Sequence, residues 1–211
     1  MIALDIDYLE YSDIAKRANK FLVQFKLERQ IPVPIEEIID LKLGVNIVPL
    51  PGIQKVFEVE GFTSSDLSTI YVDDYIYQNR PTRYRFTLAH ELGHIVLHGD
   101  LFKQHSFDEV KDWIAFIQEI DDKDHSKLEF QGYAFGGLIL VPPTHLKPLF
   151  KENLHKLNPL IKEAQRKGVF RERYLDYAKD NIAEVLAPLF DVSSDVMVRR
   201  IEFDSLEDLI P

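Results

Sequence analysis

Residues 83–94 have the sequence RYRFTLAHELGH, and the rest of the chain can be interpreted outward from this stretch. Pro81 stands just before it, and proline is favoured at the first position of a helix. Gly99 follows it at a place typical of a helix C-terminus. We therefore expect one helix over about residues 82–98, with the HELGH segment in its interior.

His90 and His94 are four residues apart in this helix. That spacing places both imidazoles on one face, one turn apart, where they can bind the same metal ion. Glu91 lies beside that face without being in line with the two ligands, so it can act on a water molecule as the catalytic base. The chain has no cysteine, so a metal here has imidazole and carboxylate ligands. Zinc is the expected ion, and manganese is an alternative for the same ligand types.

A three-ligand zinc site needs one more side chain, and the candidates lie downstream of the motif. Glu129 is favoured because it lies on an apolar helix, expected over about residues 126–141, where a carboxylate is costly unless it is paired or bound to metal. Gly132 and Gly136 give that helix a small face that would allow close packing against the motif helix. We interpret His98 as a polar residue at the end of the motif helix. The remaining candidates are expected to be solvated: His105, Glu109, Asp112, Glu119 and His125.

Upstream of the motif helix, the pattern predicts two helices and then a small sheet. Apolar residues recur at helical spacing over residues 11–29, and a shorter helix is expected from Ile35 to Leu43, where Gly44 stops it. A run of β-formers follows, with a turn signal near Asp66 that predicts a hairpin. The sheet is expected to be mostly antiparallel, with strands over residues 45–47, 56–62 and 69–72.

Downstream of the motif helix, the chain is predicted to be almost entirely helical. Helices are expected over residues 108–120 and 126–141, and the second is closed by Pro142-Pro143. Residues 144–203 are helical in pattern, with breaks near Pro159, Gly168 and Pro188. Together the elements predict an α+β fold with a core over residues 1–143 and a helical region over residues 144–211 packed on it.

Residues 182–200 resemble a helix-turn-helix, with the turn at 190–193 and a cap at Ser193 or Ser194. Only Arg199 and Arg200 are basic there, which is too few for several phosphate contacts. We therefore interpret the segment as two helices packed on the core and expect it not to bind DNA. One of the two arginines, Arg200, is a candidate to reach the catalytic cleft and stabilise an oxyanion. The expected core contacts are Phe190, Val192, Val196 and Ile201.

The chain resembles the ImmA/IrrE family of zinc metallopeptidases. The resemblance is carried by residues 83–94, by Leu97-His98, and by a second block that runs from Glu129 through Phe135 to Leu140-Val141-Pro142. The family typically shows R-x-R-F-T-x-A-H-E-L-G-H and then E-x-x-A-N-x-F-A-x-x-L-L-M-P. Weaker similarity extends over about residues 15–203.

The resemblance implies a zincin-like fold in which His90, His94 and Glu129 bind zinc and Glu91 is the catalytic base. It also implies a narrow endopeptidase, because the best understood members cleave helix-turn-helix repressors in phage-like elements or in stress regulation. The second block departs from the pattern, since the family's Ala-Asn is Gly132-Tyr133 here. Tyr133 therefore either replaces the contact of that asparagine to the metal site or removes it.

Composition limits the other classes of function. The 211 residues are 45% hydrophobic and 28% charged, which is ordinary for a globular protein, and the net charge of -10 disfavours binding to phosphate backbones. The chain has no cysteine, and residues 1–7 do not show the basic segment followed by an apolar run that is typical of a signal peptide. We therefore expect a cytoplasmic protein without a membrane span.

Two functional hypotheses follow. The first is an active zinc endopeptidase that cleaves a regulatory protein, and the strands between Val56 and Val72 would then offer an edge to an extended substrate near residues 63–70. The second is a non-catalytic interaction protein that keeps the fold and the metal. Glu91 favours the first hypothesis and Tyr133 favours the second. The pattern does not specify the oligomeric state.

Overall fold

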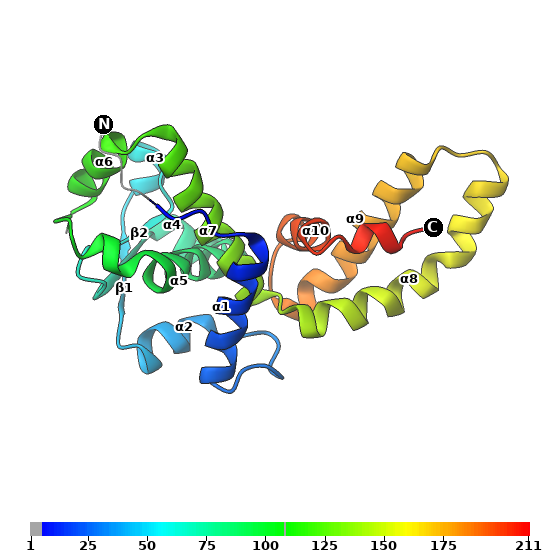
Figure 1. Cartoon of the computed structure of the whole chain (residues 1–211), viewed down its shortest axis with the longest axis horizontal. Helices are drawn as coiled ribbons and strands as arrows, with labels where there is room; N and C mark the ends of the chain where they lie inside the picture. The colour runs from blue at the N-terminus through cyan, green and yellow to red at the C-terminus, as the bar shows by residue number, and fades with distance from the viewer. Residues whose placement is uncertain (1–5, 108) are drawn as a thin grey trace.

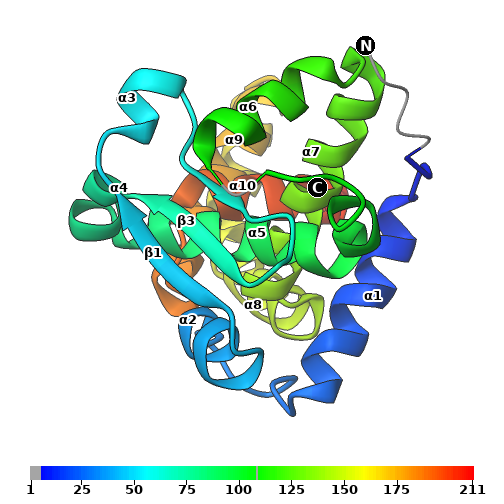
Figure 2. The ribbon, with the colours of Figure 1, turned by 90° about the vertical axis from the view of Figure 1, so that its left-hand side faces the viewer.

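The computed structural model describes residues 6–107 and 109–211, so the expectations for the N-terminal residues 1–5 and for a helix start at Asp108 lie outside the described residues. Helices dominate, and a small sheet covers one side of them (Figures 1 and 2). The elements in chain order are α1 (Tyr11–Gln24), α2 (Ile35–Glu37), the π-helical turn η1 (Ile38–Lys42), β1 (Asn46–Leu50), α3 (Ile53–Phe57), β2 (Gly61–Thr63), β3 (Thr69–Asp73), α4 (Asp74–Asn79), α5 (Pro81–Phe102), α6 (Val110–Glu119), α7 (Asp122–Leu140), α8 (Pro143–Arg166), α9 (Arg171–Phe190), α10 (Ser194–Phe203) and the 3₁₀ turn η2 (Leu206–Leu209).

The sheet has three strands in the order β1-β3-β2, which confirms the α+β class. β2 and β3 form the predicted antiparallel hairpin, in which Gly61 pairs with Val72 and Thr63 with Ile70. β1 pairs with β3 in parallel, so the sheet is mixed rather than mostly antiparallel. The reason is the connection through α3, which carries the chain past β3 before β2 begins and leaves β1 on the opposite edge (Figure 2).

The centre of the protein is the packing of α5 against α7. A methyl group added at Gly93 of α5 would stand 2.9 Å from the carbonyl oxygen of Gly132 on α7. A methyl group at Gly136 of α7 would stand 3.0 Å from backbone atoms of Ala89 and His90 on α5. Backbone lies against backbone at both places. The glycine face that we expected on α7 is therefore the surface that packs directly on α5.

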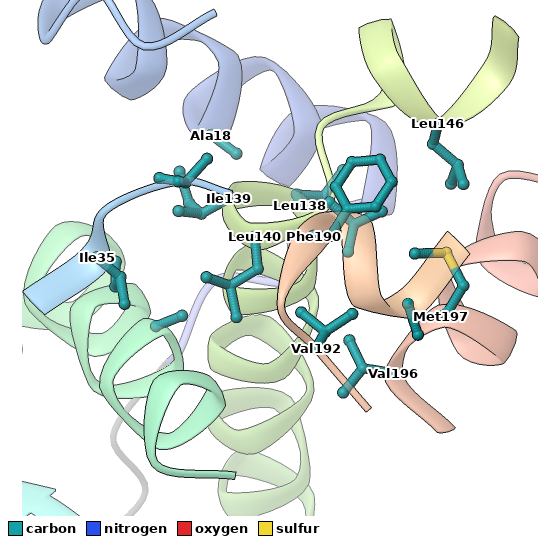
Figure 3. Close-up of a cluster of buried hydrophobic side chains, with 14 of the residues drawn as sticks. Ala18, Ile35, Leu138, Ile139, Leu140, Leu146, Phe190, Val192, Val196 and Met197 are labelled. Atoms are coloured by element: carbon teal, nitrogen blue, oxygen red, sulfur yellow. The ribbon is translucent and has the colours of Figure 1, made fainter. Parts of the chain in front are cut away.

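The C-terminal helices begin at Pro143, and α8 and α9 form an antiparallel pair that extends away from the sheet (Figure 1). α10 returns along α9, and the side chains at this junction pack under α7 (Figure 3). The four predicted core residues of this segment are all buried, and the Ser193 hydroxyl accepts the Val196 N–H at 3.3 Å as the expected cap. Among the described residues, no helix is both long and apolar enough to cross a membrane.

Several predicted boundaries differ from the structure, and apolar packing explains two of them. α1 ends at Gln24 rather than at residue 29, after its last buried residues Phe21 and Leu22. α5 continues past Gly99 to Phe102, because Phe102 is buried in a second apolar cluster with Phe107 and Phe116. The glycine is therefore inside the helix.

Hydrogen bonds and proline tolerance explain other differences. α7 begins at Asp122 rather than near residue 126, because the Asp121 carboxylate accepts the N–H of Asp124 at 2.9 Å. The strand predicted from residue 56 begins only at Gly61, since residues 53–57 form α3 with the N–H of Gln54 bonded to the Asp73 carboxylate. Pro159 lies inside α8 on its exposed side, and the helix continues past it. Pro188 lies inside the last turn of α9.

The α5–α7 contact generates a prediction for Gly136→Ala. The added methyl group meets backbone atoms that cannot move independently, so we expect it to destabilise the fold by about 1–3 kcal/mol, although alanine favours a helix by roughly 1 kcal/mol. Denaturant unfolding followed by circular dichroism measures the change. Gly99→Ala is the control, because there the methyl group meets only the end of the Leu67 side chain, at 2.8 Å. Equal stability of the two variants would contradict the role assigned to the contact.

Candidate metal centre

The structure brings together the three residues that the sequence predicts as metal ligands. His90 and His94 project from α5, with their Nε2 atoms 2.9 Å apart. The Glu129 carboxylate on α7 lies 3.5 Å from the His90 Nε2 and 3.9 Å from the His94 Nε2. Donor atoms around tetrahedral zinc stand about 3.3 Å apart, given bonds of about 2.0–2.1 Å. The spacing of these donors and their nitrogen and oxygen chemistry therefore fit a zinc ion.

Glu91 belongs to the same cluster, since its carboxylate lies within 4.8 Å of the donor atoms of His90 and His94. Its environment differs from that of Glu129. Burial raises the pKa of Glu91 to about 7, although the hydroxyl of Thr63 donates to its Oε2 at 2.9 Å. For Glu129, burial also acts to raise the pKa, but the hydrogen bond and positive charge of His90 outweigh it and lower the pKa to about 2. Glu129 is thus the ionised carboxylate, and Glu91 is the one that can exchange a proton near neutral pH.

Behind the two histidines lies a hydrogen-bonded chain that the sequence did not reveal. The Nδ1 atoms of His94 and His98 are 3.1 Å apart, and the His98 Nε2 is 2.9 Å from the Gln131 Oε1. The Gln131 Nε2 then donates to the backbone carbonyl of Asp7 at 2.8 Å. His98 is therefore buried against α7 inside α5, and it is not the polar residue at a helix end that we expected.

This hydrogen-bonded chain determines which nitrogen of each imidazole carries the proton. The backbone carbonyl of Asp7 can only accept, so the Gln131 Oε1 faces His98 and accepts from its Nε2–H. Burial lowers the pKa of His98 to about 4, so His98 is neutral near neutral pH and its Nδ1 is an acceptor. His94 must then donate from Nδ1. Its Nε2 lone pair is left facing His90 and Glu129, which is the form that binds a metal.

The cluster opens into a cleft of about 980 Å³. One wall is apolar and comes from α6, and the opposite wall comes from the N-terminal half of α5 and the start of α10. The segment that leads into β2 forms the rim. Our expectation that residues 63–70 border the cleft was wrong, because residues 57–61 line it instead. From the expected segment, Thr63 still reaches the site through its hydrogen bond to Glu91. The α6 side chains that line the cleft are Trp113, Ile114, Ile117 and Gln118.

Tyr133, which replaces the family's asparagine, lines the cleft. Its ring packs against Phe86 with the ring centroids 4.7 Å apart, and the Arg199 guanidinium lies 5.7 Å from the centre of its ring. The side chain that contacts His94 from behind is that of His98. Arg200 does not reach the cleft as we expected, because it is buried and paired with Asp204 at 3.2 Å.

Of the other ligand candidates, only His125 lies at the site. Its Nε2 is 3.9 Å from the Glu129 carboxylate, and it lines the cleft. The remaining candidates do not line it: His105, Glu109, Asp112 and Glu119.

The comparisons with known proteins agree with this geometry. No curated protein matches the chain significantly. A peptidase family model described as the IrrE N-terminal-like domain matches residues 42–202, a stretch that runs from before β1 into α10 and includes both α5 and α7. The match covers well over half of the chain, and a His–Glu–His cluster compatible with a metal site lies inside it. The chain therefore belongs to the IrrE N-terminal-like family of metallopeptidases.

Proposed function

We propose that the protein is a zinc-dependent endopeptidase of the H-E-x-x-H type with narrow specificity. The observation that carries the proposal is the pair of carboxylates at one cluster. The Glu129 carboxylate lies 3.5 Å from the His90 Nε2 and 3.9 Å from the His94 Nε2, whereas Glu91 is buried beside them and accepts a hydrogen bond from the Thr63 hydroxyl. One group is suited to hold a cation, and the other is suited to move a proton near neutral pH.

His90, His94 and Glu129 would hold the ion, and manganese suits the same donors. A bound zinc ion would supply the positive charge that polarises a peptide carbonyl and makes water more acidic. Glu91 would take a proton from the attacking water and give it to the leaving amine. Thr63 would hold the Glu91 carboxylate in place through its hydroxyl, which donates to Oε2.

The free edge of β2 beside the cleft is the reason to propose that the substrate binds in an extended form. The pairs Glu60–Asp73 and Ser64–Thr69 bond across to β3, so the backbone groups of Gly61 point to the other edge. Gly61 lines the cleft, and a substrate strand could pair there. Only a flexible segment can adopt that form, so we propose a loop of a regulatory protein as the substrate. The family resemblance favours a helix-turn-helix repressor.

The alternative is a non-catalytic protein that retains the fold and metal. Tyr133 was the reason to consider it, since loss of the asparagine could have freed a ligand histidine. His98 and Gln131 orient His94 from the other side, so the substitution does not leave that ligand without support. The hydrogen-bonded, buried base Glu91 also favours the enzyme.

Metal content tests the ligand set. We expect the purified protein to bind about one zinc ion per chain, and we expect His90→Ala and Glu129→Ala to lose most of it after dialysis. Elemental analysis measures the ratio. His155→Ala is the matched control, because His155 is exposed on α8. Full zinc retention in His90→Ala would rule out the site.

Glu91→Gln tests the catalytic role. The amide cannot accept a proton, so activity should fall on the order of 10²–10⁴-fold, while zinc content and fold remain unchanged. Because the substrate is unidentified, a cell extract can be incubated with each protein and new N-termini labelled and sequenced by mass spectrometry. We expect new termini with the wild type and with the exposed control Glu152→Gln, and none with Glu91→Gln. The same termini from Glu91→Gln would refute the mechanism.

His98 tests the proton arrangement behind the metal. Without His98 the Nδ1–H of His94 loses its acceptor, so His98→Ala should weaken zinc binding by about 10–100-fold. Gln131→Glu keeps an acceptor oxygen for His98 and should bind zinc better than Gln131→Leu. Competition with a chelator measures affinity, and ¹⁵N NMR of the imidazoles of the metal-free protein reports which nitrogen of His94 is protonated.

Phe116→Ala controls for packing, because it removes a buried aromatic side chain of the neighbouring cluster and leaves His94, His98 and Gln131 unchanged. It should lower stability and leave zinc affinity intact. If His98→Ala binds zinc with normal affinity and the proton of His94 is still on Nδ1, then His98 and Gln131 do not orient His94.

A further inference from the structure

Positive charge is concentrated in one part of this acidic protein. Residues 143–173, here called the basic arm, contain eight Lys and Arg against three Glu, a net charge of +5. The other 180 residues contain 17 Lys and Arg against 32 Asp and Glu, a net charge of -15. The arm consists of α8 and the first residues of α9. The whole-chain charge of -10 therefore hides two regions of opposite sign.

Within the arm, the charges gather on one face of α8. At about 100° per residue, four Lys and Arg side chains, one His and one Asn fall within an arc of about 100°, together with Thr144, Pro148 and Gln165, and no acidic side chain of α8 shares that arc. All of them except the half-buried asparagine are exposed. Lys147 and Arg166 are 19 residues apart, which is about 28 Å along a helix. Six side chains of this face, here called the basic stripe, are Lys147, Lys151, His155, Asn158, Lys162 and Arg166.

The charges of the stripe are not neutralised within the chain. The two acidic residues of α8 lie on another face, where Glu152 pairs with Lys156 at 2.8 Å and Glu163 with Lys167 at 2.7 Å. For the described residues, no ion pair involves the four cations of the stripe: Lys147, Lys151, Lys162 and Arg166. They are available to an external anion.

The position of the arm reduces repulsion from the acidic residues of the sheet and of the metal-site helices, although α9 carries Asp176, Asp180 and Glu184 beside it. α8 and α9 extend away from the sheet and from the metal-site helices (Figure 1). Exposed charges more than about 10 Å apart are largely screened at 0.1 M salt. A polyanion laid along the stripe would therefore meet the local positive field rather than the average field of the protein.

The chemistry of the stripe favours nucleic acid over an acidic protein. Protein docking surfaces have an apolar centre surrounded by polar residues, whereas the stripe consists of basic and amide side chains. Lysine, arginine, histidine and asparagine all donate hydrogen bonds, and phosphate oxygens only accept them. A straight row of donors about 28 Å long also approaches one turn of duplex DNA, roughly 34 Å.

We infer that the basic stripe of α8 binds the phosphate backbone of duplex DNA without reading its sequence. The helix-turn-helix-like segment takes no part, because Arg200 is buried against Asp204 and Arg199 lies over the ring of Tyr133. Our expectation of no DNA binding rested on that segment and on the net charge of the whole chain. The stripe changes the expectation for the protein but not for the segment.

Fluorescence anisotropy with a labelled 20-base-pair duplex of arbitrary sequence tests the inference on the full chain. Four phosphate contacts predict a slope of about -3.6 for log affinity against log salt, so affinity should fall on the order of 100-fold between 50 and 200 mM salt. We expect micromolar binding at the lower salt. Lys151→Gln/Lys162→Gln should weaken binding and bring the slope closer to zero by about 2.

The matched control removes the same charge from the same helix. Lys156→Gln/Lys167→Gln changes two lysines on the opposite face, both already paired with glutamate, and should bind DNA nearly as the wild type does. Arg199→Gln should also bind normally. Circular dichroism verifies that α8 stays folded in every variant.

Three results would overturn the inference. One is no binding by the wild type at 50 mM salt. Another is an equal loss of DNA affinity in Lys151→Gln/Lys162→Gln and in Lys156→Gln/Lys167→Gln, which would show that net charge rather than the stripe determines binding. The third is equal affinity for polyglutamate of the same charge, which would assign the stripe to acidic protein segments. None of these results bears on the peptidase proposal, whose test uses Glu91→Gln.

Discussion

The close approach of α5 and α7 determines the rest of this structure. His90 and His94 belong to one helix and Glu129 to another, so their donor atoms meet only if the two backbones nearly touch. Glycines at positions 93, 132 and 136 allow this, and a methyl group at any of them would meet atoms of the facing helix at 2.9–3.0 Å. Any larger residue would move Glu129 away from the imidazoles. The close contact of α5 and α7 is thus required both for the packing of the core and for the assembly of the site.

The same helix contact sets the protonation states at the site. Burial between α5, α7 and β2 raises the pKa of Glu91, while proximity to His90 keeps Glu129 ionised against the same effect of burial. The hydrogen-bonded chain from His94 through His98 and Gln131 ends on the backbone of Asp7, so the segment before α1 takes part in orienting His94. The two carboxylates and the histidines His90, His94 and His98 therefore differ in protonation because their surroundings differ.

The C-terminal helices are tied to the core by a buried polar junction. Arg200 pairs with Asp204, donates to the carbonyl of Val141 at the end of α7 and contacts the hydroxyl of Tyr11 on α1. A buried cation is tolerated only when it is paired and hydrogen-bonded in this way. An apolar cluster that includes Leu138, Leu140, Phe190 and Met197 also joins α7 to α9 and α10 (Figure 3). α10 is thereby held beside the cleft, while α8 and α9 extend outward.

The sequence by itself determined the motif helix, the α+β class and the residues that meet at the candidate centre, because helical spacing and glycine placement are local properties. Only the tertiary structure decided the parallel pairing of β1, the helix at residues 53–57 and the continuation of α5 to Phe102, since each depends on a partner distant in the chain. The same holds for the site. His98 has the pattern of a helix end, and Arg200 has the pattern of a free cation. Their roles depend on Gln131 and Asp204, and which side chains meet in space is decided by packing rather than by spacing in the sequence.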